Sequence, residues 1–106
     1  MRVELSSGLW DGYYEQYGGR HGQTMTLEFA DGLMRGDGID SIGAFTIEGE
    51  YRVDAGDVRV GWIKTYEGRH SVLYLGHLDN GRIVGRWEIQ GWGDKFALKP
   101  VQKRIL

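Results

Sequence analysis

The sequence predicts an all-β domain in which about eight strands close into an antiparallel up-and-down barrel. Apolar and polar residues alternate with a period of two along most of the chain, as in strands that bury one face. Turn signals recur roughly every 10–12 residues. Glycine is abundant and proline nearly absent, with 18 copies and 1 copy, which is typical of a chain that turns often and bends its strands. A sandwich of two sheets is the alternative fold.

Residues 1–106 form a single domain at this length. Asp31-Gly32 and Asn80-Gly81 are signals for two-residue type I′ hairpins. The first pairs Ala30 with Leu33, and the second pairs Leu78 with Ile83. The expected strands cover residues 9–17, 24–29, 33–36, 45–53, 58–66, 70–78, 83–89 and 96–98.

This register turns most of the large apolar side chains to one face, and they fill most of the inward positions of a small barrel. Inward glycines at Gly12, Gly36, Gly49, Gly76 and Gly85 supply the bends that closure needs. The predicted inward residues are Trp10, Tyr14, Met25, Leu27, Phe29, Met34, Phe45, Ile47, Tyr51, Val58, Val60, Trp62, Val72, Tyr74, Ile83, Trp87, Ile89, Phe96 and Leu98.

The two ends of the predicted barrel differ in their turns. Tight turns at 31–32, 54–57 and 79–81 lie at one end. Looser, glycine-rich loops at 18–22, 38–43, 67–69 and 91–94 lie at the other. Because function gathers on loops held by a rigid scaffold, a ligand site is expected at the loose end.

Lys64 falls in phase with Val60 and Trp62, so it should point inward, although an unpaired buried ammonium is costly. Its stem either extends to the mouth or its ammonium meets an anion or a tyrosine hydroxyl. Tyr66 and His70 lie on the same face. The candidate ligand-binding residues are Lys64, Tyr66, His70, Trp62, Tyr74, Trp87 and Tyr14.

This cluster predicts a non-catalytic barrel that binds a small apolar or partly anionic ligand at its loop end. The alternative is a structural or protein-interaction module with a filled barrel, in which the same residues form a solvated rim. A third possibility is an enzyme that uses Tyr66 and His70 as acid and base. Lys64→Met is expected to weaken binding of an anion and to leave folding intact.

Several functional classes lack support in the sequence. No serine lies in a nucleophile elbow and there is no cysteine, so no catalytic residue and no cofactor is predicted. His21 and His70, with Asp40 or Asp94 nearby, are the best metal-ligand set, and their spacing does not require a metal. The net charge is −2 with scattered basic residues, so neither nucleic acid nor membrane is an expected partner. The N-terminal residues lack the apolar core of a secretory signal, and a cytoplasmic location is expected.

Four apolar residues point outward from neighbouring strands, namely Ile63, Leu73, Leu75 and Val84. A contiguous apolar patch on a small domain usually marks an interface, so we expect a homodimer joined through this face. The competing interpretation is a bulge at 67–69 that flips the sixth strand and turns Leu73 and Leu75 into the core.

Gly8-Leu9-Trp10 at the start of the first strand resembles the Gly-x-Trp of calycins, the superfamily of lipocalins, fatty-acid-binding proteins and avidins. The resemblance implies that Trp10 closes one end of the barrel and that a basic residue, Lys99 or Arg104, lies over it. The stretch 17–22 followed by Leu27-x-Phe29 is also similar to the lipocalin-like domains of F-box and EXECUTER-type proteins. Those domains imply no catalytic motif.

Overall fold

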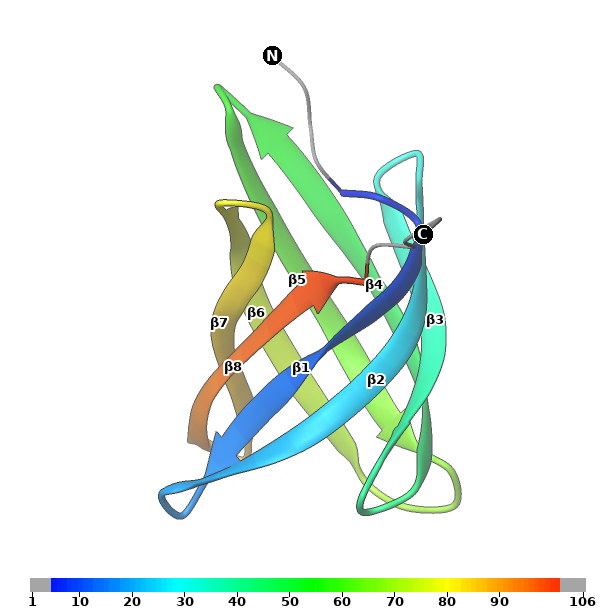
Figure 1. The fold of residues 1–106 in the computed structure, drawn as a ribbon, viewed down its shortest axis with the longest axis vertical. Coiled ribbons are helices and arrows are strands. Elements are labelled where there is room, and N and C mark those ends of the chain that lie inside the picture. Colours follow the sequence, from blue (N-terminus) through cyan, green and yellow to red (C-terminus); the bar gives the residue numbers. More distant parts are fainter. Residues whose placement is uncertain (1–4, 102–106) are drawn as a thin grey trace, which may run out of the picture.

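Eight antiparallel strands form one closed barrel in a computed structural model that describes residues 5–101 (Figure 1). Each strand pairs with the next and β1 pairs with β8, so none of the eight described strands has a free edge. The strands are β1 (Gly8–Gln16), β2 (Gly19–Ala30), β3 (Leu33–Asp40), β4 (Ala44–Asp54), β5 (Asp57–Tyr66), β6 (Ser71–Asp79), β7 (Arg82–Ile89) and β8 (Trp92–Pro100). The predicted up-and-down barrel is confirmed and the sandwich alternative is wrong. The described residues contain no helix long and apolar enough to cross a membrane.

The two hairpin signals set the register as predicted. Asp31 and Asn80 have φ of 54° and 53°, and the glycine after each also has positive φ, as a type I′ turn requires. Ala30 pairs with Leu33, and Leu78 pairs with Ile83. Because side chains alternate along a strand, these pairings fix which face of each strand enters the barrel.

Two of the four predicted loose loops are instead tight hairpins. Tyr17-Gly18 joins β1 to β2 and Gln90-Gly91 joins β7 to β8, with φ of 53° at Tyr17 and 52° at Gln90. The first strand pair continues to Gln16 and Gly19, so residues 19–22 belong to β2. Tyrosine and glutamine rarely take this left-handed conformation, which is why the sequence pattern did not identify these turns. The longer connections at this end are residues 41–43 and 67–70.

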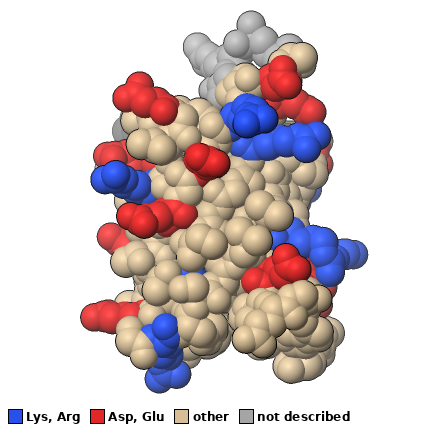
Figure 2. All heavy atoms as spheres, turned by 180° about the vertical axis from the view of Figure 1, so that it is seen from behind, with Lys and Arg blue, Asp and Glu red and all other residues tan. Residues whose placement is uncertain are grey.

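The outer face of β5 and β6 is uncharged at its centre. Figure 2 shows this side of the barrel as a largely uncharged band with charged side chains along its margins. Ile63 and Leu73 form a cross-strand pair there, and Leu75 is 54% exposed. Tyr74, the residue between the two leucines, is only 2% exposed and faces the core. The interpretation with a flipped sixth strand is therefore wrong.

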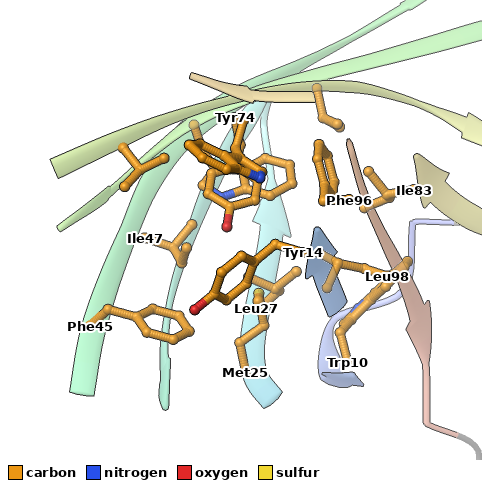
Figure 3. Close-up of a cluster of buried hydrophobic side chains, with 14 of the residues drawn as sticks. Trp10, Tyr14, Met25, Leu27, Phe45, Ile47, Tyr74, Ile83, Phe96 and Leu98 are labelled. Carbon is orange, nitrogen blue, oxygen red and sulfur yellow. The ribbon is translucent and has the colours of Figure 1, made fainter. Parts of the chain in front are cut away.

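The barrel interior is a continuous packed core (Figure 3). Nearly all of the predicted inward residues are buried, while Phe29, Tyr51 and Ile89 are partly exposed and pack against the core. The fully buried side chains are Trp10, Trp62, Tyr74, Phe45, Lys64, Met25, Leu27, Met34, Ile47, Ile83 and Leu98. Such dense filling leaves little room for a ligand inside the barrel.

Inward glycines let neighbouring strands approach closely. A Cβ on Gly49 would overlap the carbonyl oxygen of Gly61 and lie 2.5 Å from the Cβ of Trp62. The same holds at the other predicted inward glycines, where the overlapping atom is also a backbone oxygen. These positions therefore need glycine because a side chain would push two strands apart.

Trp10 closes the end of the barrel opposite the longer connections. It is fully buried, and its indole N–H donates a hydrogen bond of 2.8 Å to the carbonyl oxygen of Ser6. Leu5 packs against the same core. Lys99 does not lie over Trp10, because it pairs with Asp11 and is exposed. Arg104, the other basic residue that the resemblance implied, lies outside the described residues.

Candidate functional site

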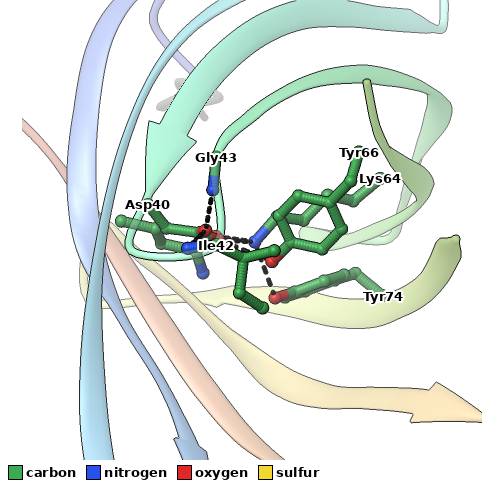
Figure 4. A network of polar contacts seen from close by, with 7 residues as sticks. Asp40, Ile42, Gly43, Lys64, Tyr66 and Tyr74 are labelled. Carbon is green, nitrogen blue, oxygen red and sulfur yellow. Dashed lines mark hydrogen bonds and ion pairs between the residues drawn. The ribbon is translucent and has the colours of Figure 1, made fainter. Parts of the chain in front are cut away.

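A buried polar network lies inside the barrel at the end that carries the longer connections (Figure 4). Gln23 enters from β2, Asp40 from the end of β3, Lys64 and Tyr66 from β5, and Tyr74 from β6. The side chains of Lys64 and Asp40 are both 0% exposed. Charged groups are rarely buried so completely unless they are paired.

Lys64 points inward, as its phase with Val60 and Trp62 predicted. Its Nζ donates hydrogen bonds to Asp40 Oδ2 at 2.6 Å and to Gln23 Oε1 at 2.9 Å, with the Tyr74 hydroxyl at 3.5 Å. Of the two predicted arrangements, the ammonium meets an anion and does not extend to the mouth. The anion comes from the chain itself.

Four aromatic rings also surround the Lys64 ammonium. The distances from Nζ to the ring centroids are 4.3 Å for Phe45, 4.8 Å for Tyr66, 4.9 Å for Tyr14 and 5.5 Å for Tyr74. A cation over an aromatic face is attracted by the ring quadrupole, and this attraction is strongest away from water. The rings thus offset part of the hydration that Lys64 loses on burial.

Asp40 joins this network to the loop that follows it. Its Oδ2 accepts a second hydrogen bond of 2.6 Å from the Tyr66 hydroxyl. Its Oδ1 accepts from the backbone N–H of Ile42 at 2.8 Å and of Gly43 at 3.4 Å. An aspartate often bonds to the backbone two residues later, so the sequence Asp-Ser-Ile-Gly forms this turn locally. One carboxylate therefore anchors both the lysine and the loop.

Burial and pairing shift the pKa values of this network in opposite directions. Burial alone would raise the pKa of Asp40, but hydrogen bonds from Lys64 and Tyr66 outweigh it and hold that pKa below its ordinary value. Burial lowers the pKa of Lys64 against the pull of Asp40. Burial, with the adjacent Asp40 carboxylate, raises the pKa of Tyr66. Asp40 is therefore an anion and Tyr66 a neutral donor at neutral pH.

Two buried polar atoms near the core have no hydrogen-bond partner among the described residues, Gln23 Nε2 and Trp62 Nε1. The Trp62 indole stacks on Tyr74 with ring centroids 5.1 Å apart and an interplanar angle of 11°. An unsatisfied buried donor costs about 1–3 kcal/mol.

The predicted site residues fall into three positions. Lys64, Tyr66, Tyr74 and Tyr14 converge within the barrel, as the distances above show. Trp62 and Trp87 lie behind them in the core and face Tyr74 and Tyr14, respectively. His70 is exposed at the rim, where its ring lies 5.0 Å from that of Tyr66.

Two members of the network were missed. From the sequence Asp40 is expected only as a carboxylate near a possible metal-ligand set, and its role inside the barrel is not predicted. Gln23 is in phase with Met25 and Leu27 on β2, so the alternation that identified Lys64 also places Gln23 inward. A buried glutamine and a buried lysine in one small barrel together predict a polar contact.

The remaining space at this end is small. A cavity of about 40 Å³ opens between Ile42, Tyr66, His70 and Trp87. That volume is close to the share of one water molecule in the liquid, about 30 Å³. No group of three metal-ligating side chains occurs in the part of the chain that the structure describes.

Comparison with known proteins gives no further guidance: no protein-family model matches the chain, and no curated protein is similar to it in sequence.

Proposed function

We propose that the protein is a non-catalytic interaction module that works through the outer surface of a filled barrel. The observation that carries this proposal is the occupied interior, where Asp40 of the same chain already neutralises Lys64. A cavity for a drug-sized ligand usually measures about 300–1,000 Å³, against about 40 Å³ at the loop end. We also propose that the protein is located in the cytoplasm and that it is related to calycins. Gly8-Leu9-Trp10 and the closed barrel support the relation to calycins.

The partner proposed here is a second copy of the chain, bound through the outer apolar face formed by Ile63, Leu73, Leu75 and Val84. Leu75 stands between two surface hollows of about 800 Å³ and 710 Å³, and both hollows include it in their walls. A two-fold axis that runs along the strands between β5 and β6 would bring Leu75 of each copy over Gly61 of the other. Within one copy Leu75 already leans over Gly61, since a Cβ added to Gly61 would lie 3.1 Å from Leu75 Cδ2, so the two leucines would contact each other across the axis, as a two-fold interface requires.

Charge at the margins both favours and opposes this orientation. In the register of the sheet, Glu50 lies across from Gly61 and Arg86 across from Leu75. The two-fold axis therefore sets Glu50 of one copy against Arg86 of the other. It also sets Glu48 against Glu88, a like-charge contact that weakens the dimer.

Leu75→Glu should convert the dimer into a folded monomer, because it places a charge at the centre of the apolar contact. Native mass spectrometry and sedimentation equilibrium at tens of micromolar measure this change. Leu9→Glu is the matched control, since Leu9 is also about half exposed, at 46%, but lies on β1. Glu88→Lys should tighten the dimer by replacing a repulsion with an attraction. A wild-type protein that is monomeric at this concentration contradicts the proposal.

A second candidate function is the binding of a small anionic ligand at the loop end, by Lys64, Tyr66, His70, Trp62, Tyr74, Trp87 and Tyr14. The observation that favours it is the convergence of two donors, Lys64 Nζ and the Tyr66 hydroxyl, on one carboxylate oxygen, each at 2.6 Å. A ligand carboxylate would have to replace that of Asp40, whose loop would then move outward. The same native mass spectra test this idea, because a co-purified ligand adds mass to the monomer.

A further inference from the structure

Two exposed aromatic side chains meet at the rim of the barrel, on strands other than those of the outer apolar face. Tyr17 is at the tip of the β1–β2 hairpin and is 83% exposed, while Trp92 begins β8 and is 48% exposed. Their ring centroids lie 5.2 Å apart and the rings are tilted by 46°. Aromatic surface from two segments that are distant in sequence is therefore exposed at one place on the rim.

The backbone of Tyr17 is strained for a residue of its type. Its φ is 53°, in the left-handed region, where a type I′ turn normally carries asparagine, aspartate or glycine. At the opposite end the same turn position holds Asp31 and Asn80, which follow that preference, and Ala55, which does not. A bulky residue held in an unfavourable conformation at an exposed tip points to a role other than stability.

Trp92 is supported from behind by the core. Its ring packs edge to face on Trp87 with centroids 5.5 Å apart. The Trp87 indole N–H in turn donates a hydrogen bond of 2.8 Å to the carbonyl oxygen of Glu15 on β1. The exposed pair thus rests on a fixed base, so its ring faces are positioned before any ligand arrives.

The polar groups beside Tyr17 on β1 and β2 include one ion pair and one amide. Arg20 lies over the ring of Tyr13 at 4.1 Å and pairs with Glu15 at 3.5 Å. Gln16 precedes Tyr17 and offers an uncharged amide. Stacking surfaces for nucleic acid are accompanied by unpaired basic residues that follow the phosphates. Here Arg20 is paired with Glu15, and Arg86 donates a hydrogen bond of 3.3 Å to the carbonyl oxygen of Gly93.

From this combination we propose that Tyr17 and Trp92 form a binding site for a neutral saccharide chain. A pyranose ring has an apolar C–H face that stacks on an aromatic ring and hydroxyl groups around its edge. The amide of Gln16 and the Arg20–Glu15 pair can donate to and accept from those hydroxyls. Two ring faces tilted against each other suit two successive sugar units. The proposal does not depend on dimer formation.

The probes are neutral hexasaccharides of β-1,4-linked glucose, α-1,4-linked glucose, β-1,4-linked xylose, β-1,4-linked mannose and N-acetylglucosamine. Titration calorimetry and tryptophan fluorescence should show saturable binding of at least one of them. Trp92→Ala should then weaken that binding at least tenfold. If none of the five binds at millimolar concentration, the proposal is wrong.

Tyr17→Asn separates binding from folding. It should weaken saccharide binding at least fivefold and raise the melting temperature by several degrees, because asparagine suits the turn. Gln90→Asn is the matched control: it makes the same improvement in the neighbouring turn and should leave binding unchanged. If Tyr17→Asn alters sedimentation and no saccharide binds, the aromatic pair is a protein contact and the proposal is overturned.

Discussion

Replacing Asp40 with alanine should lower the free energy of unfolding by about 3–5 kcal/mol, because it leaves the Lys64 ammonium buried without its anion. The whole stability of a domain of this size is typically about 5–15 kcal/mol, so Asp40→Ala is expected to bring the protein close to unfolding. Urea denaturation followed by tryptophan fluorescence measures the loss. Asp37→Ala is the control on the same strand, since Asp37 is exposed and faces outward, and it should change stability by less than about 0.5 kcal/mol.

The partner substitution makes this test specific. Lys64→Met alone should also destabilise, because it leaves the buried Asp40 carboxylate without its cation. This reverses the expectation from sequence that Lys64→Met leaves folding intact, which considered only the cost of the inward lysine charge. The double variant Asp40→Ala/Lys64→Met should be more stable than Asp40→Ala, since no unpaired charge remains. If the losses of unfolding free energy in the two single variants simply add in the double variant, Asp40 and Lys64 are not coupled.

The same pair predicts how stability depends on pH. The folded-state pKa of Asp40 lies below its unfolded value of about 3.9, so the unfolded state takes up the proton first. The stabilisation is therefore fully present above about pH 4 and is lost as the pH falls through the lower, folded-state pKa. The urea midpoint of the wild-type protein should fall steeply in this range. In Asp40→Asn the fall should be shallower, and an identical pH profile in the two proteins would contradict the assignment.

Sequence reasoning predicted the barrel well because its two signals are local. Period-two alternation fixes which residues face inward, and Asp-Gly or Asn-Gly fixes the hairpin register. Both signals are correct for the β2–β3 and β6–β7 hairpins, where every predicted residue pair is present. The turns at Tyr17 and Gln90 were missed because their first residues are not typical of a positive φ. Type I′ turns prefer asparagine, aspartate or glycine at this position. Tyr17 departs from that preference, and this departure is one reason why it is proposed above as a binding residue.

The candidate site was predicted only in part, for a different reason. Lys64 could be placed inward because its strand neighbours fix its phase. Its partner could not be identified, since Asp40 is 24 positions away and Gln23 is 41 positions away along the chain. Which of the acidic residues reaches Lys64 depends on how far the strands are staggered around the barrel, and that stagger is a property of closure. Short-range patterns carry no information about it.

Gly49→Ala should destabilise the barrel by about 3 kcal/mol, at the upper end of the usual cost of overpacking. The added Cβ would overlap the Gly61 carbonyl oxygen and lie 2.5 Å from the Trp62 Cβ, and neither atom can move without shifting β5. Because β5 also carries Lys64 and Tyr66, the shift should disturb the buried network as well. The urea midpoint and the chemical shift of the Tyr66 hydroxyl proton measure these two effects.

Gly22→Ala is the matched control, since an added Cβ there would meet nothing closer than the Gly12 carbonyl oxygen at 3.9 Å. Gly22 is exposed on β2 and its φ is not positive, so alanine brings neither a clash nor backbone strain. Its unfolding free energy should stay within about 0.5 kcal/mol of the wild type. If Gly49→Ala proves equally harmless, the strands are not held at the close approach described here. The inward glycines would then have no part in closing the barrel.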